Sequence, residues 1–237
     1  MARDHGNAVQ AVLFDLDGTL VDTETQTDQA ISVVAARHGF AGFTLPPRET
    51  RGRTWMHVAD AIRTQTGIDA PANALAEELL SYWNDASQKA QPLPGAAAAI
   101  RAATAAGLRL AIVSSSPRSV IDRFVERLDI GECIGASARI GADSVSRGKP
   151  DPEGFLLAAR ALDVDAAATL VFEDSQAGLL AARAAGMRSI FVTRCATDIG
   201  ANTALATAWC TDYERLPSRF WPDLRAGLLD LEQRSFA

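Results

Sequence analysis

The sequence predicts an α/β fold in which a doubly wound parallel sheet carries an inserted, all-helical segment. Three observations support this prediction. A short apolar strand pattern opens the chain at residues 9–16, a stretch with helical periodicity and no convincing strand covers residues 22–92, and strand and helix patterns alternate after that point. Such alternation is typical of Rossmann-like sheets with helices on both faces.

We therefore expect residues 1–21 and 93–237 to form an α/β core and residues 22–92 to form a helical cap. Prolines and glycines punctuate the cap, and Pro94-Gly95 follows its second boundary. The expected cap helices are residues 25–38, 55–66 and 72–89.

The elements expected after the cap follow from two signals. Continuous apolar runs are typical of strands buried on both faces, and helices tend to begin after Ser or Pro and to end at Gly. The expected strands are residues 108–113, 134–136, 169–172, 189–192 and 207–210, and the expected helices are residues 96–106, 117–128, 152–162, 175–185 and 222–232. Ser116 is expected to cap the helix that starts at Pro117.

Composition limits the classes of function. The 237 residues are 48% hydrophobic and 22% charged, with a formal net charge of −6 and no apolar run long enough to span a membrane. Acidic and basic residues are interspersed, which argues against nucleic-acid binding. Three cysteines without CxxC spacing argue against a disulfide framework and a structural zinc site. The N-terminus has no signal-peptide pattern, so a cytoplasmic location is expected.

Lysine is rare in this chain. Of the 23 basic residues, 21 are Arg and two are Lys, Lys89 and Lys149. Genomic base composition accounts for the ratio. Lys149, however, lies in the segment RGKPDP, where each proline restricts the preceding residue to extended backbone. A stiff loop of this kind suits a fixed ammonium group, and an exposed surface lysine is the alternative.

Polar residues follow several expected strands, at the edge where parallel sheets bind ligands. The first strand ends in DLDGT, and alternation places Asp15 and Asp17 on the same side. Another strand ends in SSSP, and a third ends at Glu173 and Asp174. Each pattern has a structural alternative, a tight turn or a helix N-cap. Taken together, carboxylates that suit Mg²⁺, with a hydroxyl and a lysine for phosphate oxygens, predict Mg²⁺-dependent phosphoryl transfer.

These motifs resemble the haloacid dehalogenase-like hydrolase superfamily, in the branch with a helical cap after the first strand. The nearest members in appearance are β-phosphoglucomutase-like proteins and sugar-phosphate phosphatases. The matching segments span most of the chain and are DLDGT (15–19), IVSSS (112–116), GKPDP (148–152) and FEDSQAG (172–178).

The resemblance implies a role for each matched residue. Asp15 would be the nucleophile that forms an aspartyl phosphate, and Asp17 would act as general acid and then as general base. Ser114 and Lys149 would hold the phosphoryl oxygens. The implied Mg²⁺ ligands are Asp15, the backbone carbonyl of Asp17, Asp174 and, directly or through water, Glu173.

The cap loop RETRGRTW (48–55) is expected to contact the substrate, a small phosphorylated metabolite such as a sugar phosphate or a phosphorylated acid. Gly52 would let the backbone approach it, and Arg51 or Arg53 could bind a carboxylate, hydroxyls or a second phosphate. Surface arginines are the alternative. Thr19 and Ser115 are the other expected substrate contacts. The chain is expected to be a monomer or a weak homodimer.

Two other functions are considered. The resemblance implies that a phosphosugar mutase would carry a His on the first cap helix and an Arg three residues after the cap-loop glycine, where this chain has Thr27 and Trp55. Both departures favour hydrolysis, and the carboxylate of Asp17 favours a phosphate ester over a dehalogenase or phosphonatase substrate. A non-enzymatic receiver-like module is disfavoured by the DLDGT segment and the helical insertion.

Overall fold

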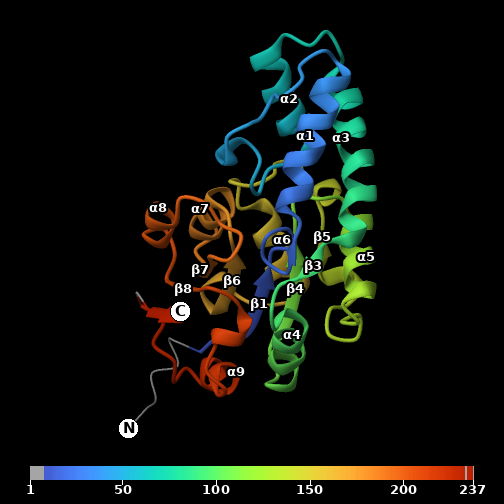
Figure 1. Cartoon of the computed structure of the whole chain (residues 1–237). Coiled ribbons are helices and arrows are strands. Elements are labelled where there is room, and N and C mark those ends of the chain that lie inside the picture. Colours follow the sequence, from blue (N-terminus) through green and yellow to red (C-terminus); the bar gives the residue numbers. More distant parts are fainter. Residues whose placement is uncertain (1–7, 233, 237) are drawn as a thin grey trace.

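The predicted fold class is confirmed by the computed structural model, which describes residues 8–232 and 234–236. A parallel sheet of seven strands has the order β5-β4-β1-β6-β7-β8-β9. The three helices of the inserted segment lie beyond one end of these strands (Figure 1). The strands are β1 Ala11–Phe14, β4 Arg109–Val113, β5 Arg139–Ile140, β6 Thr169–Glu173, β7 Arg188–Val192, β8 Ala208–Cys210 and β9 Arg234–Phe236. Residues 1–7, which the signal-peptide expectation concerns, lie outside the described part.

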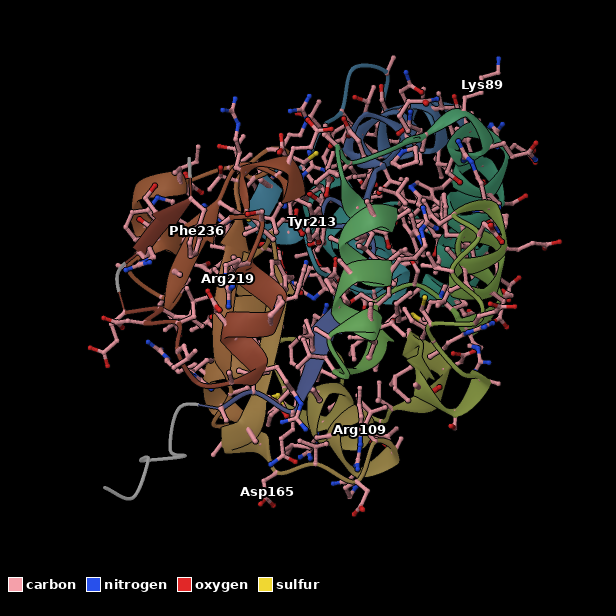
Figure 2. The ribbon with its side chains drawn as sticks, turned by 90° about the horizontal axis from the view of Figure 1, so that it is seen from below. Lys89, Arg109, Asp165, Tyr213, Arg219 and Phe236 are labelled. Carbon is pink, nitrogen blue, oxygen red and sulfur yellow. The ribbon has the colours of Figure 1, made fainter. Side chains whose placement is uncertain are left out.

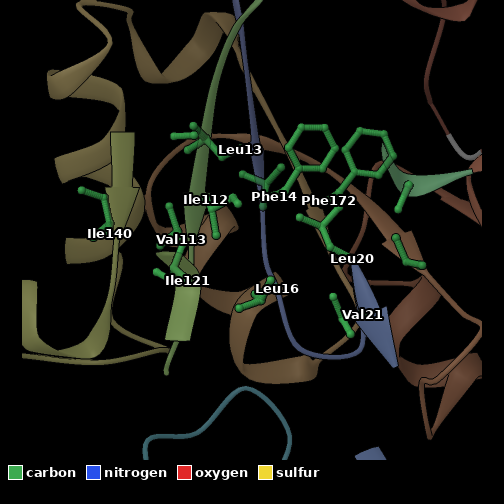
Figure 3. Close-up of a cluster of buried hydrophobic side chains, with 14 of the residues drawn as sticks. Leu13, Phe14, Leu16, Leu20, Val21, Ile112, Val113, Ile121, Ile140 and Phe172 are labelled. Carbon is green, nitrogen blue, oxygen red and sulfur yellow. The ribbon is translucent and has the colours of Figure 1, made fainter. Parts of the chain in front are cut away.

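Strand β1 lies inside the sheet, between β4 and β6. Phe14 is in register with Ile112 on one side and with Phe172 on the other. All four residues of β1 are fully buried, as a strand covered on both faces requires. Figure 3 shows the rings of Phe14 and Phe172 side by side, with centroids 5.3 Å apart. Because the strand order reverses at β1, the carboxyl ends of β1, β4 and β6 open into one crevice.

Helices cover both faces of this sheet (Figure 1). Their bounds are α4 Ala96–Ala105, α5 Arg118–Arg127, α6 Glu153–Ala161, α7 Gln176–Ala184, α8 Ile199–Thr203 and α9 Phe220–Arg225. Helix α4 contacts α9, and α6 contacts α7. Helix α7 begins after Ser175, whose side chain accepts a hydrogen bond from the Gly178 N–H. Within the described residues, no helix is both long enough and apolar enough to cross a membrane.

The inserted segment contains three helices that pack on one another. They are α1 Glu24–Arg37, α2 Trp55–Thr66 and α3 Ala72–Ala86, close to the expected bounds, and α3 contacts both α1 and α2. Each helix buries apolar residues at helical spacing; on α3 these include Leu75, Leu79 and Trp83. The last expected turn of α3 is a 3₁₀ turn, Ser87–Lys89, which leaves Lys89 exposed.

A two-stranded antiparallel ribbon joins the helical segment to the sheet. Strand β2, Val21–Asp22, pairs with strand β3, Gln91–Pro92. The expectation that no strand lies in this segment is therefore corrected at its two ends. Strands of two residues are too short to leave an alternating pattern in the sequence. The ribbon lies at both boundaries of the proposed cap and holds its entry and exit side by side.

Three other sequence-based expectations are corrected. The strand expected at residues 134–136 is absent: Ile134 is buried, a 3₁₀ turn follows, and the edge strand β5 starts only at Arg139. The last helix ends early, at Arg225, because Gly227 takes a left-handed conformation with φ of 70°. Two short elements, α8 and β9, were not expected, since each spans five residues or fewer.

Candidate active site

Three strand ends and one loop meet in the crevice. Asp15 follows β1, Ser114 follows β4, Glu173 ends β6, and Lys149 lies in the loop before α6. The sheet ladder continues one residue past two of these strands: the Asp15 N–H donates to Phe172 O at 3.0 Å, and the Ser114 N–H donates to the carbonyl of β5 residue Ile140 at 3.0 Å. The sheet itself therefore holds the backbone of both polar residues.

Lys149 is buried between two carboxylates. Its Nζ donates to Asp15 Oδ1 at 2.5 Å, to Glu173 Oε1 at 2.5 Å and to Val113 O at 3.0 Å. Burial by itself would lower the pKa of Lys149, but the attraction and hydrogen bonds of Asp15 and Glu173 raise it above its ordinary value. The ammonium group therefore stays charged and is held by three acceptors.

The buried carboxylates repel one another. Burial raises the pKa of Asp15 to about 8; Lys149 offsets part of this shift, and Glu173 and Asp17 add to it. Burial, followed by the charges of Glu173 and Asp15, also raises the pKa of Asp174 well above its ordinary value. Carboxylates gathered in this way stay ionised only when positive charge compensates them.

Asp17 is held by three hydroxyl groups. Thr23 Oγ1 donates to its Oδ1 at 3.0 Å, and Ser114 and Ser116 donate to its Oδ2 at 3.2 Å and 2.8 Å. Burial raises the pKa of Asp17, and the hydrogen bonds from Ser116, Thr23 and Ser114 offset part of that rise. A carboxyl group with a raised pKa and a fixed orientation is suited to proton transfer near neutral pH.

Two of these three hydroxyls were not expected at the site. Ser116 does not cap α5, because the N-cap residue is Pro117 and the N–H of Arg118, the first residue of the helix, donates to Asp143 Oδ1 at 3.0 Å. Its place two residues after Ser114 was a signal for this position. Thr23 lies six positions after Asp17, across a tight turn in which the Gly18 N–H donates to Val21 O at 2.8 Å.

A cluster of carboxylates could hold a divalent cation. Asp15, Glu173 and Asp174 each offer an oxygen atom, and these atoms lie within 4.8 Å of one another. Asp174 Oδ2 is buried without a hydrogen-bond partner, as expected of an atom whose partner is a metal ion. Hard oxygen ligands of this kind fit Mg²⁺. The carboxylate of Asp17 faces the hydroxyls, so its backbone carbonyl is the group left for a cation.

The structure bears on two of the expected assignments, Glu173 as a metal ligand and Thr19 as a substrate contact. Both oxygens of Glu173 already have partners, Lys149 on Oε1 and the N–H and Oγ of Ser175 on Oε2. Thr19 is fully buried and donates to Asp174 Oδ1 at 3.1 Å, so it orients Asp174 and does not face the substrate space. The assignment of Thr19 as a substrate contact is therefore corrected.

A cavity of about 40 Å³ lies between the cap and the crevice, above Asp15 and Asp17. Its walls include Ser115 and two tryptophans of the cap, Trp55 and Trp83, whose ring centroids are 5.9 Å apart. Ser115 Oγ donates to Gly52 O at 2.8 Å, so it also ties the cap loop to the core. The volume accommodates about three water molecules. The cavity as it stands in this structure is therefore smaller than a phosphorylated metabolite.

The two candidate arginines of the cap loop differ. Arg53 lines the cavity and donates to Arg48 O and Lys149 O at 3.3 Å and 3.4 Å. Arg51 does not line it. The Arg51 guanidinium forms ion pairs with Glu24 and Asp28 on α1. Its expected contact with the substrate stays a prediction. An arginine with two acidic neighbours on the adjacent helix is used to hold the loop.

The chain thus has a Rossmann-like α/β core with a helical insertion, and buried carboxylates and a lysine meet at the carboxyl ends of its central strands. Residues 9–186, more than half of the chain, match the family model described as haloacid dehalogenase-like hydrolase. The chain belongs to this family, which confirms the predicted family and the prediction of a hydrolase.

Curated relatives and solved structures resemble the chain. It is 32% identical over 186 residues to validoxylamine A 7′-phosphate phosphatase from Streptomyces hygroscopicus subsp. limoneus, covering 78% of this chain and 85% of that protein. It is 34% identical over 185 residues to hexitol phosphatase A from Escherichia coli, covering 76% and 81%. It spans 48% of a bifunctional riboflavin kinase/FMN phosphatase from Arabidopsis thaliana. A putative β-phosphoglucomutase from Bacteroides vulgatus shares the fold, with a TM-score of 0.77, 24% identity and coverage of 95% and 89%.

Proposed function

We propose that this hydrolase is a phosphatase that cleaves a small phosphomonoester through an aspartyl-phosphate intermediate and depends on Mg²⁺. One observation carries the proposal: the Asp15 carboxylate touches the Lys149 ammonium at 2.5 Å, beside the hydroxyl-bound Asp17 and beneath a small cavity. A nucleophile, a cation for phosphate oxygens and an acid–base group are thus together at one largely buried site.

The chemistry proceeds in two steps. Asp15 attacks the phosphorus atom, the bond to the leaving oxygen breaks, and the Asp17 carboxyl group gives its proton to that oxygen. Asp17, now a carboxylate, then takes a proton from water as the water attacks the phosphorus atom. The bond between phosphorus and Asp15 breaks, which releases inorganic phosphate and restores the Asp15 carboxylate.

The other residues hold the groups in place. Lys149 places positive charge beside the phosphoryl oxygens, and the Ser114 hydroxyl, which donates to Asp17 in this structure, would turn to those oxygens when substrate is bound. Mg²⁺, held by Asp15, Asp174 and the backbone carbonyl of Asp17, would neutralise charge on the phosphoryl group. Glu173 keeps the Lys149 ammonium oriented toward Asp15.

A phosphosugar mutase is the less favoured function. At the position where the resemblance implies a mutase His, the Thr27 hydroxyl donates to Thr23 O at 3.2 Å and accepts from Trp83 Nε1 at 3.2 Å. The Thr27 hydroxyl is thus engaged within the cap, and a threonine hydroxyl is too weak an acid and base to replace a His in proton transfer. The sugar phosphates named for two relatives, validoxylamine A 7′-phosphate phosphatase and hexitol phosphatase A, support a sugar phosphate as the substrate class.

A screen for phosphate release over several dozen phosphorylated metabolites tests the proposed function. With Mg²⁺ present, we expect turnover of one or more small sugar phosphates or phosphorylated acids. Removal of Mg²⁺ by a chelator should lower the rate by at least about a hundredfold, because a bound divalent cation stabilises transition-state charge by several kcal/mol. Restored Mg²⁺ should restore activity.

The same screen separates the alternatives. If no phosphoester releases phosphate, the proposed activity is wrong. If the chelator has no effect, the dependence on Mg²⁺ is wrong. If a bisphosphate activator brings about isomer formation without phosphate release, the protein is a mutase.

Gly52 is expected to be required for the closed cap. It has φ of 66°, and a Cβ built there would lie 2.2 Å from Ser175 Oγ, on the side chain that caps α7. Gly52→Ala should therefore lower kcat/KM by about tenfold to a hundredfold, since the catalytic groups and the cap loop no longer meet. Gly42→Ala is the matched control, because Gly42 has φ of 77° and no atom within 4 Å of a built Cβ. Steady-state kinetics on both variants check this, and an equal, small loss in both would contradict it.

A further inference from the structure

Glu24, the first residue of α1, brings a carboxylate from the cap to the edge of the cation site. Its side chain is 13% exposed and lines the cavity above Asp15. A Cβ built at Gly18 would lie 2.9 Å from Glu24 Oε1 and 2.2 Å from Asp174 Oδ2. Glu24 Oε1 and Asp174 Oδ2 therefore lie close to the same point, one from the proposed cap and the other from the core. Because Gly18 has no side chain, the space between the two oxygens stays open.

The two oxygens differ in their partners. Asp174 is 3% exposed, and its Oδ2 has no hydrogen-bond partner. Glu24 Oε2 forms an ion pair with Arg51, and Arg51 Nη1 also donates to Glu24 O at 3.4 Å. Glu24 Oε1 is the oxygen directed toward Gly18 and Asp174. Two carboxylate oxygens brought this close repel each other unless a proton or a cation compensates them.

The charges around this point favour a cation. Three carboxylates surround the point, those of Asp15, Asp174 and Glu24. The positive charge of Lys149 is already shared between Asp15 and Glu173. Arg51 contacts Glu24 on the side of Oε2 and also pairs with Asp28 on α1. Arg51 also interacts with the charge of Asp174. The carboxylates of this region, which are those of Asp15, Glu173, Asp174 and Glu24, thus outnumber its two cations, Lys149 and Arg51.

We propose that Glu24 strengthens Mg²⁺ binding at the Asp15–Asp174 site by adding a carboxylate from the closed cap. Glu24 is then a positioning residue, which acts from outside the direct ligands of the cation. The proposal rests on the proposed function, in which these residues hold Mg²⁺. Because Glu24 belongs to the cap and Asp174 to the core, cation binding and cap closure favour each other. Arg51 competes with the cation for Glu24 and keeps the carboxylate in place when no cation is bound.

Isothermal titration of the whole chain with Mg²⁺ alone, without substrate, tests the proposal. Glu24→Gln should raise the dissociation constant for Mg²⁺ by about tenfold, at the low end of the range for groups that support a metal site from outside its direct ligands. Asp28→Asn is the matched control, because Asp28 pairs with the same arginine at 3.1 Å but is 58% exposed. The dissociation constant of the Asp28→Asn variant for Mg²⁺ should equal that of the wild type.

A third variant separates this role from simple anchoring of the cap loop. Arg51→Gln should leave Mg²⁺ binding unchanged or make it tighter, since it removes a positive charge that competes for Glu24. If Glu24 served only to hold Arg51, Glu24→Gln and Arg51→Gln would weaken binding alike. Circular dichroism and thermal melts of the three variants establish that each is folded.

The proposal is overturned if Glu24→Gln binds Mg²⁺ as tightly as the wild type, or if Arg51→Gln weakens binding as much as Glu24→Gln does. The proposed function is tested separately by phosphate release. A wild-type chain that binds Mg²⁺ with the expected pattern but hydrolyses no phosphoester would contradict that function and leave the role of Glu24 standing.

Discussion

Replacing Asp15 with Asn is expected to lower kcat for the best phosphomonoester by at least about a thousandfold, because an amide cannot form the aspartyl phosphate. The side chains have nearly the same shape, and the amide oxygen of the variant would still accept a hydrogen bond from Lys149. The loss therefore reports chemistry and not packing. Rapid acid quench of the wild type during turnover should trap a phosphoryl group on the peptide that contains Asp15, and the variant should trap none.

The stability of the same variant gives a second readout. Burial raises the pKa of Asp15 to about 8, so its charged form is costly in this pocket, and Glu173 and Asp17 add repulsion. A neutral amide removes that cost, so the melting temperature without Mg²⁺ should not fall. Asp69→Asn, at an exposed cap position, should leave both turnover and melting temperature unchanged. Turnover of Asp15→Asn at the wild-type rate would sink the aspartyl-phosphate mechanism.

Lys149→Arg is expected to lower kcat by about a hundredfold or more, although it keeps the charge. The Lys149 side chain is 5% exposed, its Nζ bonds to three oxygens, and it lies 5.2 Å from the centre of the Phe155 ring. A planar guanidinium is larger than an ammonium group and cannot take the same position. A displacement of about 1 Å at reacting groups costs about a hundredfold in rate.

Lys89→Arg is the matched control for this substitution. Lys89 is exposed at the end of the cap segment, and Figure 2 shows it at the outer rim of the molecule. Its replacement should leave kcat unchanged. Steady-state kinetics of the two variants decide the matter: equal activity of both would show that this loop needs only a positive charge, and that the compact ammonium of Lys149 has no special role.

The central residues of the site were predictable because their signal is local. A buried strand followed by acids can be recognised within a few residues, and this pattern marked Asp15, Asp17 and Asp174. Lys149 was recognisable from the prolines around it and from the rarity of lysine. Parallel strands end at one edge of the sheet, so these residues could be placed in one crevice from the sequence alone.

The remainder was not predictable because it depends on which side chains meet in the folded chain. Thr23 meets Asp17 across a tight turn of six positions, and Ser116, from a distant segment, bonds with the same carboxylate. Arg51 and Arg53 are the same residue type, two positions apart in one loop. In the structure Arg51 pairs with acidic residues of α1, whereas Arg53 lines the cavity, and the sequence does not distinguish the two.

By itself, the sequence determined the sheet, the helical insertion and the chemical groups at the strand ends, because hydrophobic periodicity and residue type are local properties. Tertiary structure alone decided which groups touch. Lys149 bonds to Asp15 across 134 positions of the chain, and the packing of α1 against the core places Glu24 Oε1 and Asp174 Oδ2 beside Gly18. The physical reason is burial: once the strand order and the cap exclude water, charge–charge contacts between distant residues set the ionisation and the role of each carboxylate.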